Sequence, residues 1–238
     1  MIATTFGLLL ALLALSLPVA AAMGIVGLVL ADTYAFMPIW RALGQTAWTA
    51  ANDGVLVAVP FFILLGELLL RSGMATRMYG AMAKWLSWLP GGLMHANIGT
   101  CAMFAATCGS SVATAATVGT TAIGQVRRFG YNERLFLGTI AASGTLGILI
   151  PPSINLIIYG ALTNPSIPQL YLAGFLPGLM LAVLFSLTVL IACRLRPAWG
   201  GERIRVSWAE RLASLPDLLP PLGVFALVVG SIYAGLAT

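Results

Sequence analysis

Two clusters of small, polar and helix-breaking residues interrupt the hydrophobic stretches of this chain. The first is Cys108-Gly109-Ser110-Ser111 and the second is Leu149-Ile150-Pro151-Pro152-Ser153. Each lies where its segment should be near the depth of a membrane core. Backbone without helical hydrogen bonds is tolerated there only if protein buries it or if it lines a polar cavity. Two such breaks in one chain are typical of a transporter's binding site.

The first cluster offers two kinds of ligand group. The hydroxyls of Ser110 and Ser111, together with nearby carbonyls, suit a small hard cation, and the free amides that begin the next helix favour an anionic substrate. Four threonines follow on the same segment: Thr114, Thr117, Thr120 and Thr121. They either extend a polar lining or only cap and close-pack helices, and we favour the second interpretation for the last two.

The second cluster supplies its chemistry through proline. Pro151 and Pro152 lack amide hydrogens, so the carbonyls of Gly147 and Ile148 should lose their helical partners and become available to a cation. Small or hydroxylated residues on the preceding turns would let the first cluster approach: Ser143, Gly144, Thr145 and Gly147. The alternative is a kink that water or neighbours repair, but the pairing of the two clusters favours binding.

The composition indicates that lipid is the solvent for most of this chain. Of its 238 residues, 60% are hydrophobic and only 8% are charged. The net charge of +5 comes from basic residues between hydrophobic segments, which is typical of membrane topology and not of a nucleic-acid partner. We therefore expect one membrane domain over residues 1–238. Cys101, Cys108 and Cys193 lack metal-ligand spacing and are expected to be free and buried.

Residues 1–89 are expected to form N-terminal helices and an amphipathic arm helix. The segment 1–22 imitates a secretory signal but lacks a basic start, so we expect a retained membrane segment that Pro18 breaks. Whether residues 1–30 cross once or as two shorter helices stays open. The aromatic segment 32–52 suits the membrane interface, and residues 54–70 suit a crossing.

Charged residues add detail to this N-terminal part. Glu67 is expected to pair with Arg71 at the interface. In the amphipathic helix of residues 74–89, one face is predicted to be polar and to lie along the membrane surface. Its members are Arg77, Ala81, Lys84 and Ser87.

Residues 90–128 are predicted to form a re-entrant hairpin. Its arms, residues 96–108 and 112–127, would be roughly 20 to 24 Å long, shorter than the ~30 Å hydrocarbon core. Basic residues flank both ends, so both ends are expected in the cytoplasm. His95, near the start of the first arm, is expected to be a satisfied interfacial side chain rather than a proton carrier.

Residues 132–165 are predicted to form a helix that Pro151-Pro152 breaks, and residues 168–238 two further transmembrane helices. The loop 194–211, with five arginines, is expected in the cytoplasm, and residues 164–166 in the periplasm.

Motifs along nearly the whole chain resemble those of one transporter family, the large membrane subunit of tripartite ATP-independent periplasmic (TRAP) transporters, which is associated with dicarboxylates and related organic acids. The motifs stand in the family's order: Pro60-Phe61-Phe62-Ile63-Leu64-Leu65-Gly66-Glu67, Leu89-Pro90-Gly91-Gly92, Gly109-Ser110-Ser111-Val112-Ala113-Thr114-Ala115-Ala116, Gly144-Thr145-Leu146-Gly147-Ile148-Leu149-Ile150-Pro151-Pro152-Ser153 and Ala173-Gly174-Phe175-Leu176-Pro177-Gly178.

The resemblance implies an all-α polytopic protein of the bacterial inner membrane, one half of an inverted-repeat secondary transporter. It implies sodium-driven import of organic acids of the C4-dicarboxylate type, with no cofactor other than the coupling sodium ion. The implied partners are a small four-helix membrane subunit, a periplasmic substrate-binding protein and a carboxylate substrate. The implied sodium ligands are Gly109, Ser110, Ser111, Thr145, Gly147 and Pro151. The substrate pocket is expected to involve Ser111, Val112, Thr114, Ser143, Pro152 and Ser153.

Length is the main departure from the family pattern. The family's large subunit continues into a second, inverted half, so this chain is expected to be a truncated or split subunit that holds about half of the ligands and does not transport alone. An enzyme is disfavoured, since His-Glu-x-x-His and Gly-x-Ser-x-Gly are both absent from the sequence. An ion channel and a non-transporting structural membrane subunit remain as alternatives.

Overall fold

The computed structural model describes residues 1–34, 40–163 and 165–236, which are helical apart from turns, loops and one isolated β-bridge. The chain divides into two compact units, Met1–Asp53 and Gly54–Thr238. Parts of three sequence expectations lie outside the described residues: residues 35–39 of the interfacial segment, residue 164 of the periplasmic turn and residues 237–238 at the end of the last helix.

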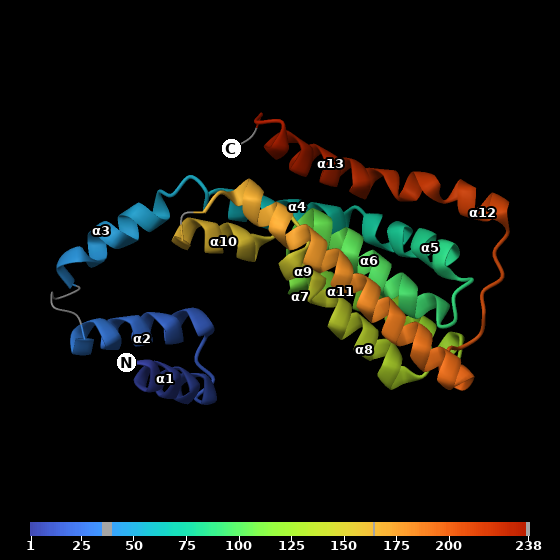
Figure 1. The fold of residues 1–238 in the computed structure, drawn as a ribbon, viewed down its shortest axis with the longest axis horizontal. Coiled ribbons are helices and arrows are strands. Elements are labelled where there is room, and N and C mark those ends of the chain that lie inside the picture. Colours follow the sequence, from blue (N-terminus) through green and yellow to red (C-terminus); the bar gives the residue numbers. More distant parts are fainter. Residues whose placement is uncertain (35–39, 164, 237–238) are drawn as a thin grey trace. The chain divides into compact units, whose positions relative to one another are not determined.

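The first unit contains α1 (Ile2–Ala14), α2 (Val19–Tyr34) and α3 (Trp40–Ala51). The Thr4 hydroxyl lies 3.3 Å from the Tyr34 hydroxyl, at the opposite ends of α1 and α2, so the two helices run antiparallel (Figure 1). Their connection includes Ser16 with φ +59° and Pro18, which has no amide to continue the helix. The N-terminal segment therefore forms two helices, of 13 and 16 residues.

The second unit holds the two predicted break clusters. Its helices are α4 (Ala58–Arg71), α5 (Met74–Leu86), α6 (Gly92–Cys108), α7 (Ser111–Arg128), α8 (Glu133–Gly144), α9 (Leu146–Leu149), α10 (Ile154–Thr163), α11 (Ile167–Leu195), α12 (Trp208–Ala213) and α13 (Leu219–Tyr233), with 3₁₀ turns at Pro197–Trp199 and Leu215–Asp217.

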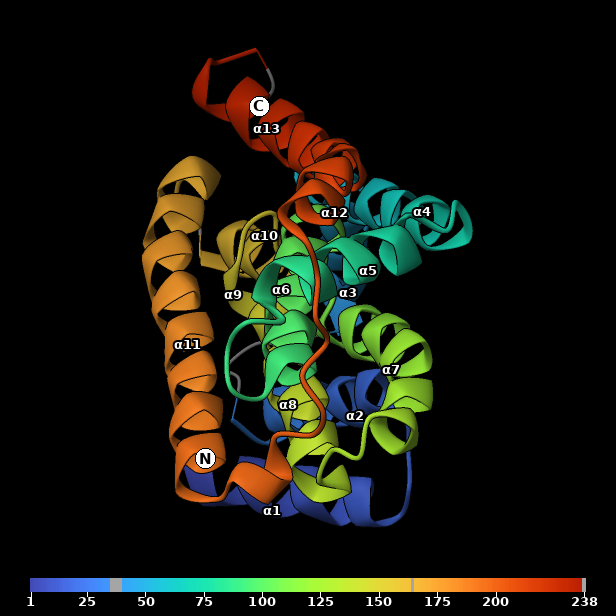
Figure 2. The same ribbon diagram turned by 90° about the vertical axis from the view of Figure 1, so that its right-hand side faces the viewer.

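Helix α6 forms the centre of this unit (Figure 2). It packs against α4, α5, α7, α8, α9, α11 and α13, and most of its residues are buried. Its residues 92–98 are all buried, so neighbours surround the helix on every side over this stretch. Within this core the Asn97 side chain donates to the Thr139 hydroxyl of α8 at 2.9 Å.

Helix α5 corrects the predicted amphipathic face. It turns from α4 by 68° and packs closely on α6, and Ala81 and Ser87 are only 1% and 4% exposed. The predicted polar face is therefore wrong for Ala81 and for Ser87, which are both buried. The small Ala81 side chain fits a packed face as readily as an exposed one, and the Ser87 hydroxyl satisfies itself by donating to the Lys84 carbonyl at 2.9 Å.

Two segments are long and apolar enough to cross a membrane: Glu133–Thr163, which contains the predicted break, and Ile167–Leu195. Two bent pairs pass the same criterion if each counts as one span, α4 with α5 and Trp208–Asp217 with α13. Neither hairpin arm is among these spans of the described residues. With 17 and 18 residues, α6 and α7 are about 26 and 27 Å long, somewhat longer than predicted. Re-entry of this helical hairpin into a membrane stays a prediction.

The base of the hairpin is held by a tyrosine in the turn between α7 and α8. The Tyr131 hydroxyl accepts a hydrogen bond from the Leu93 amide at 3.1 Å, and so satisfies one of the free donors at the start of α6. Burial raises the pKa of Tyr131, so the hydroxyl remains neutral. His95 is also satisfied as predicted, since its two ring nitrogens contact the Pro90 carbonyl and the Ser186 hydroxyl.

Candidate functional site at the hairpin tip

The turn between α6 and α7 is built around Gly109. This residue ends α6 in the left-handed conformation, with φ +62°. A Cβ atom at position 109 would collide with the Pro152 carbonyl oxygen, so only glycine fits this contact. The Gly109 carbonyl also accepts a hydrogen bond from the Ile154 amide at 3.4 Å. The hairpin tip therefore touches the proline break directly.

Ser110 begins α7 as its N-cap. Its extended backbone lets the hydroxyl accept from the Ala113 amide at 3.4 Å. The Ser110 carbonyl accepts from the Thr114 amide at 3.0 Å and from the Thr114 hydroxyl at 2.7 Å. Thr114 is fully buried, so its hydroxyl stabilises the tip from behind. The amides of Ser111 and Val112 remain at the positive end of α7.

Two glycines of the broken helix let it approach the tip at backbone distance. A Cβ added at Gly147 would lie 2.7 Å from the Ser111 nitrogen and 2.9 Å from the Ser110 oxygen. One added at Gly144 would lie 2.7 Å from the Ala115 Cβ and 3.4 Å from the Ser111 oxygen. No real Cβ tolerates the shorter of these distances. The close approach predicted from the small residues of this segment is confirmed.

The break itself is only partly as predicted. α9 ends at Leu149, Ile150 is extended, and the Ser153 hydroxyl donates to the Ile148 carbonyl at 2.6 Å. The expectation that the prolines leave the Ile148 carbonyl free is therefore wrong, because a serine beyond the break replaces the missing amide. The prediction holds for Gly147. Pro151 has no amide hydrogen, so it cannot donate to the Gly147 carbonyl four residues earlier.

Helix α11 supports the break from the other side with two glycines one turn apart. A Cβ at Gly174 would lie 2.7 Å from the Leu149 oxygen, and one at Gly178 would lie 2.8 Å from the Ile150 Cγ1. The Ala173 to Gly178 motif therefore has a packing role. Its two glycines form a flat face on which the end of α9 rests.

The other residues predicted as ligands differ in their hydrogen-bond partners and in their burial. The buried Ser143 hydroxyl donates to the Thr139 carbonyl at 2.5 Å, and the exposed Thr145 hydroxyl donates to the Ala142 carbonyl at 2.7 Å, so both bond within their own segment. Val112 is 78% exposed. Pro152 and Ser153 are fully buried, and Pro151 lines an apolar pocket of about 190 Å³ with α11 and α13 residues. The residues brought together are Gly109, Ser110, Ser111, Gly147 and Pro152.

Sequence reasoning missed the contribution of α4. A cavity of about 100 Å³ lies beside the tip, lined by Phe62, Ile63, Gly66, Glu67, Leu70, Phe104, Cys108, Ser110, Ala113 and Thr117. A Cβ at Gly66 would lie 2.8 Å from the Cys108 Cβ, so α4 packs directly on the end of α6. The Thr117 hydroxyl is buried with no hydrogen-bond partner in the described part of the chain.

The predicted pair of Glu67 and Arg71 is confirmed at 2.6 Å. A glycine next to a carboxylate within an apolar segment is the signal that could have linked α4 to the tip. The Thr120 and Thr121 hydroxyls both donate to the Thr117 carbonyl of their own helix, in agreement with the structural interpretation that the sequence favours for them.

The arrangement as a whole presents oxygen ligands and backbone amides at a protein-lined break. The tip contributes hydroxyl and carbonyl oxygens, with the Gly147 carbonyl facing no helical amide, and these are the ligand types that hard cations prefer. No cluster of three or more histidine, cysteine or acidic side chains suited to a metal occurs in residues 1–34, 40–163 and 165–236.

Comparison with known proteins identifies the family of this chain. Residues 6–238 match the family described as "Tripartite ATP-independent periplasmic transporter, DctM component". The chain is 31% identical over its whole length to the C4-dicarboxylate TRAP transporter large permease protein DctM of Vibrio cholerae, of which it covers 52%. It is 32% identical over 99% of its length to the ectoine TRAP transporter large permease protein TeaC of Halomonas elongata, covering 54% of that protein.

A third relative is the sialic acid TRAP transporter permease protein SiaT of Haemophilus influenzae, which is 36% identical over 76% of this chain, covering 29% of that protein. The chain thus spans about half the length of the first of these relatives. The match includes the hairpin tip, the proline break and the α11 glycines, which are the three parts of the candidate site. The chain belongs to the DctM family of large permease subunits of TRAP transporters, which are transporters and not enzymes.

Proposed function

We propose that this chain forms one half of the membrane subunit of a sodium-coupled secondary transporter in the bacterial inner membrane. In this proposal the re-entrant hairpin of residues 90–128 and the broken helix of residues 132–165 hold the coupling ion between them. An organic acid, delivered by a periplasmic binding protein, binds at the same contact. The small four-helix subunit and a second half of the large subunit complete the transporter.

The observation that carries the proposal is the backbone contact between the tip and the break. Gly147 admits the Ser110 and Ser111 backbone at distances that no side chain would allow, and Gly109 does the same for Pro152. Such contacts bring the backbone of the hairpin tip against the backbone of the broken helix. Backbone carbonyls at helix breaks coordinate sodium in transporters built from discontinuous helices. We assign the ion to Gly109, Ser110, Ser111 and Gly147, with Thr145 and Pro151 at its edge.

The substrate class follows from the start of α7. The amides of Ser111 and Val112 lie at the positive end of an 18-residue helix, which favours a carboxylate. The large exposed fraction of Val112, 78%, leaves this end of the helix open to a ligand. The relatives are named for C4-dicarboxylates, ectoine and sialic acid. A C4-dicarboxylate is the first substrate to test, with Thr114, Ser143, Pro152 and Ser153 supporting the pocket from behind.

The test is uptake of labelled C4-dicarboxylates, ectoine and sialic acid into proteoliposomes. The vesicles contain this chain, a separately expressed second half, the small subunit and the cognate binding protein, with and without an inward sodium gradient. We expect uptake only when sodium and the binding protein are both present. Sodium flux that needs no substrate would indicate a channel. Full assembly with neither flux would indicate a structural subunit, and each result would contradict the proposal.

A further inference from the structure

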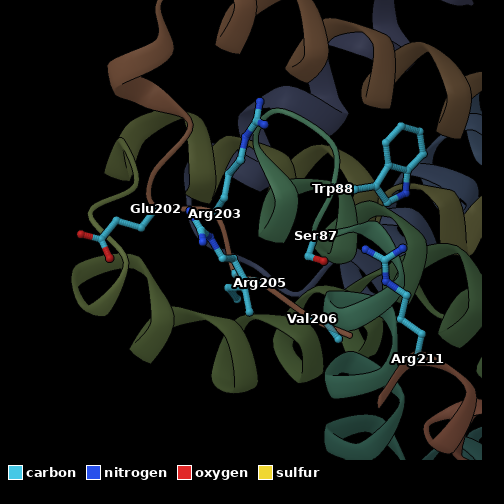
Figure 3. A pocket seen from close by; sticks show the side chains of 8 residues that line it. Ser87, Trp88, Glu202, Arg203, Arg205, Val206 and Arg211 are labelled. Carbon is cyan, nitrogen blue, oxygen red and sulfur yellow. The ribbon is translucent and has the colours of Figure 1, made fainter. Parts of the chain in front are cut away.

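An arginine-lined pocket lies apart from the hairpin tip, where residues 196–207 connect α11 to α12 (Figure 3). Its volume is about 710 Å³. It is lined by Ser87 and Trp88 after α5, by Glu202, Arg203, Ile204, Arg205 and Val206 of the connection, and by Arg211 of α12. The proposed transport function uses none of these residues, so the pocket needs an explanation of its own.

Backbone hydrogen bonds fix the connection against the base of the hairpin. The Glu202 amide donates to the Phe129 carbonyl at 2.8 Å, and the Asn132 amide donates to the Trp199 carbonyl at 3.3 Å. Tyr131 and Gly200 form an isolated antiparallel bridge between the same segments. The wall of the pocket is therefore anchored to α7 and α8 and is not a free loop.

Residues 203–206 alternate between core and solvent in the manner of an extended strand. Ile204 packs on the core cluster around α6, while its neighbours Arg203 and Arg205 are exposed. Residues two apart in an extended segment lie on the same side, about 7 Å from each other. The burial of Ile204 thus holds two guanidinium groups on one side of the connection, at the rim of the pocket.

The positive charge of this pocket is not neutralised within the described residues. Within the described residues, no carboxylate oxygen forms an ion pair with Arg203, Arg205 or Arg211. Figure 3 shows the Glu202 carboxylate directed away from Trp88 and Arg211. The other nearby carboxylate, Glu210, is occupied in the capping box with Ser207.

Arg211 also lacks a hydrogen-bond acceptor. Its Nε is buried and has no hydrogen-bond partner in the described part of the chain, while its guanidinium lies 4.9 Å from the centre of the Trp208 ring. A buried guanidinium nitrogen without an acceptor is unfavourable. The acceptors that match the planar fork of arginine are the oxygens of carboxylates and phosphates.

Tryptophans locate the pocket relative to the membrane. Trp88 is 62% exposed and Trp208 is 70% exposed, although both are large and mostly apolar. Exposed tryptophans of membrane proteins concentrate at the level of the lipid headgroups, where the ring is partly in hydrocarbon and its N–H is hydrated. A cluster of arginines at this depth attracts anionic lipids.

We propose that this pocket, formed by Trp88, Arg203, Arg205 and Arg211, binds the phosphate of an anionic phospholipid headgroup. The guanidinium groups hold the phosphate oxygens, Arg211 gains the acceptor that its Nε lacks, and Trp88 packs along the upper part of the acyl chains. Bound lipid would tie the connection of residues 196–207 to the membrane surface.

The test is native mass spectrometry of the purified full chain in detergent, titrated with phosphatidylglycerol or phosphatidylcholine. We expect phosphatidylglycerol to bind more tightly. Each arginine-to-glutamine change should weaken that binding about five-fold, and R203Q/R205Q/R211Q roughly a hundred-fold. E202Q, which removes the negative charge at the rim, should strengthen it by up to about five-fold.

R134Q is the matched control, since Arg134 is an exposed arginine of α8 that does not line the pocket. It should leave phosphatidylglycerol binding unchanged. Lysine at the three positions should restore only part of the binding, because the charge returns without the fork. An unchanged lipid preference in R203Q/R205Q/R211Q would overturn the proposal. Complete displacement of phosphatidylglycerol by excess inorganic phosphate would also overturn it, by identifying a soluble anion as the ligand.

Discussion

At the scale of single residues, Ser110 has two roles that a pair of variants can separate. Its hydroxyl caps α7, and in our proposal it also contributes to the ion site. Ser110→Ala should cost about 1 kcal/mol of stability through the lost cap. It should also raise the sodium concentration for half-maximal uptake roughly ten-fold, since a ligand to a charged group is lost. The measurements are thermal unfolding and sodium-dependent uptake of the assembled transporter.

Asn132→Ala is the control for this change, because Asn132 caps α8 through the Leu135 amide at 3.0 Å, at the other end of the hairpin. It should lose comparable stability and keep the normal sodium dependence. Equal sodium dependence in both variants would leave Ser110 with a structural role alone.

Gly147 is the residue at which backbone contact is closest to the tip. Gly147→Val would place side-chain atoms against the Ser110 and Ser111 backbone, which cannot move aside as a flexible side chain would. We expect loss of sodium-dependent uptake, with a destabilisation of about 1–3 kcal/mol. Gly138→Val on α8 is the matched control, since a Cβ at Gly138 meets no atom within 4 Å. Normal uptake by Gly147→Val would show that this contact is dispensable.

The residues of the tip were predictable because glycine, serine and proline change backbone hydrogen bonding in known ways. In the sequence, Gly109 and Pro151 indicate the two helix breaks. Gly144 and Gly147 indicate that the broken helix approaches the hairpin tip closely. The replacement of a missing backbone hydrogen bond by a side chain was not predictable. The bond from Ser153 to the Ile148 carbonyl depends on how the chain turns after the prolines, and no spacing rule specifies that turn.

At the scale of elements, the packing of the broken helix against α11 can be tested at a single position. A Cβ at Gly174 would meet the Leu149 carbonyl, so Gly174→Val should separate α11 from α9. We expect a loss of about 1–3 kcal/mol in the free energy of unfolding, measured by thermal denaturation in detergent. Gly230→Val on α13, where a Cβ meets no atom within 4 Å, should change stability little. Equal losses of stability in Gly174→Val and Gly230→Val would contradict the proposed packing of α9 on α11.

Element boundaries followed from the sequence to within a few residues, because prolines and glycines end most of these helices. The hairpin predicted over residues 90–128 is observed as α6 and α7, and the predicted broken helix as α8, α9 and α10. The packing between elements that are distant in the sequence could not be predicted in the same way. The contact of α4 with the tip and the burial of Ala81 on α5 depend on which neighbours cover each face, and composition alone does not encode that choice.

At the scale of the whole molecule, hydrogen bonds across the second unit constrain its topology. The turn between α7 and α8 and the connection after α11 are joined by the bond from the Glu202 amide to the Phe129 carbonyl. Both must therefore lie on one side of the membrane. The sequence reached the same grouping from loop charge alone, and its choice of the cytoplasmic side remains a prediction that labelling can test.

Single-cysteine labelling in intact cells provides that test. The native Cys101, Cys108 and Cys193 are at most 3% exposed, so an impermeant maleimide should react only with introduced cysteines. Arg128→Cys and Glu202→Cys should be labelled only after permeabilisation, because both segments belong to the basic face that loop charge predicts to be cytoplasmic. Ser166→Cys, exposed before the start of α11 at the opposite end of that helix, should be labelled from outside. Labelling of Arg128→Cys and Glu202→Cys from opposite sides would contradict the fold, whereas labelling of both from outside would invert only the orientation.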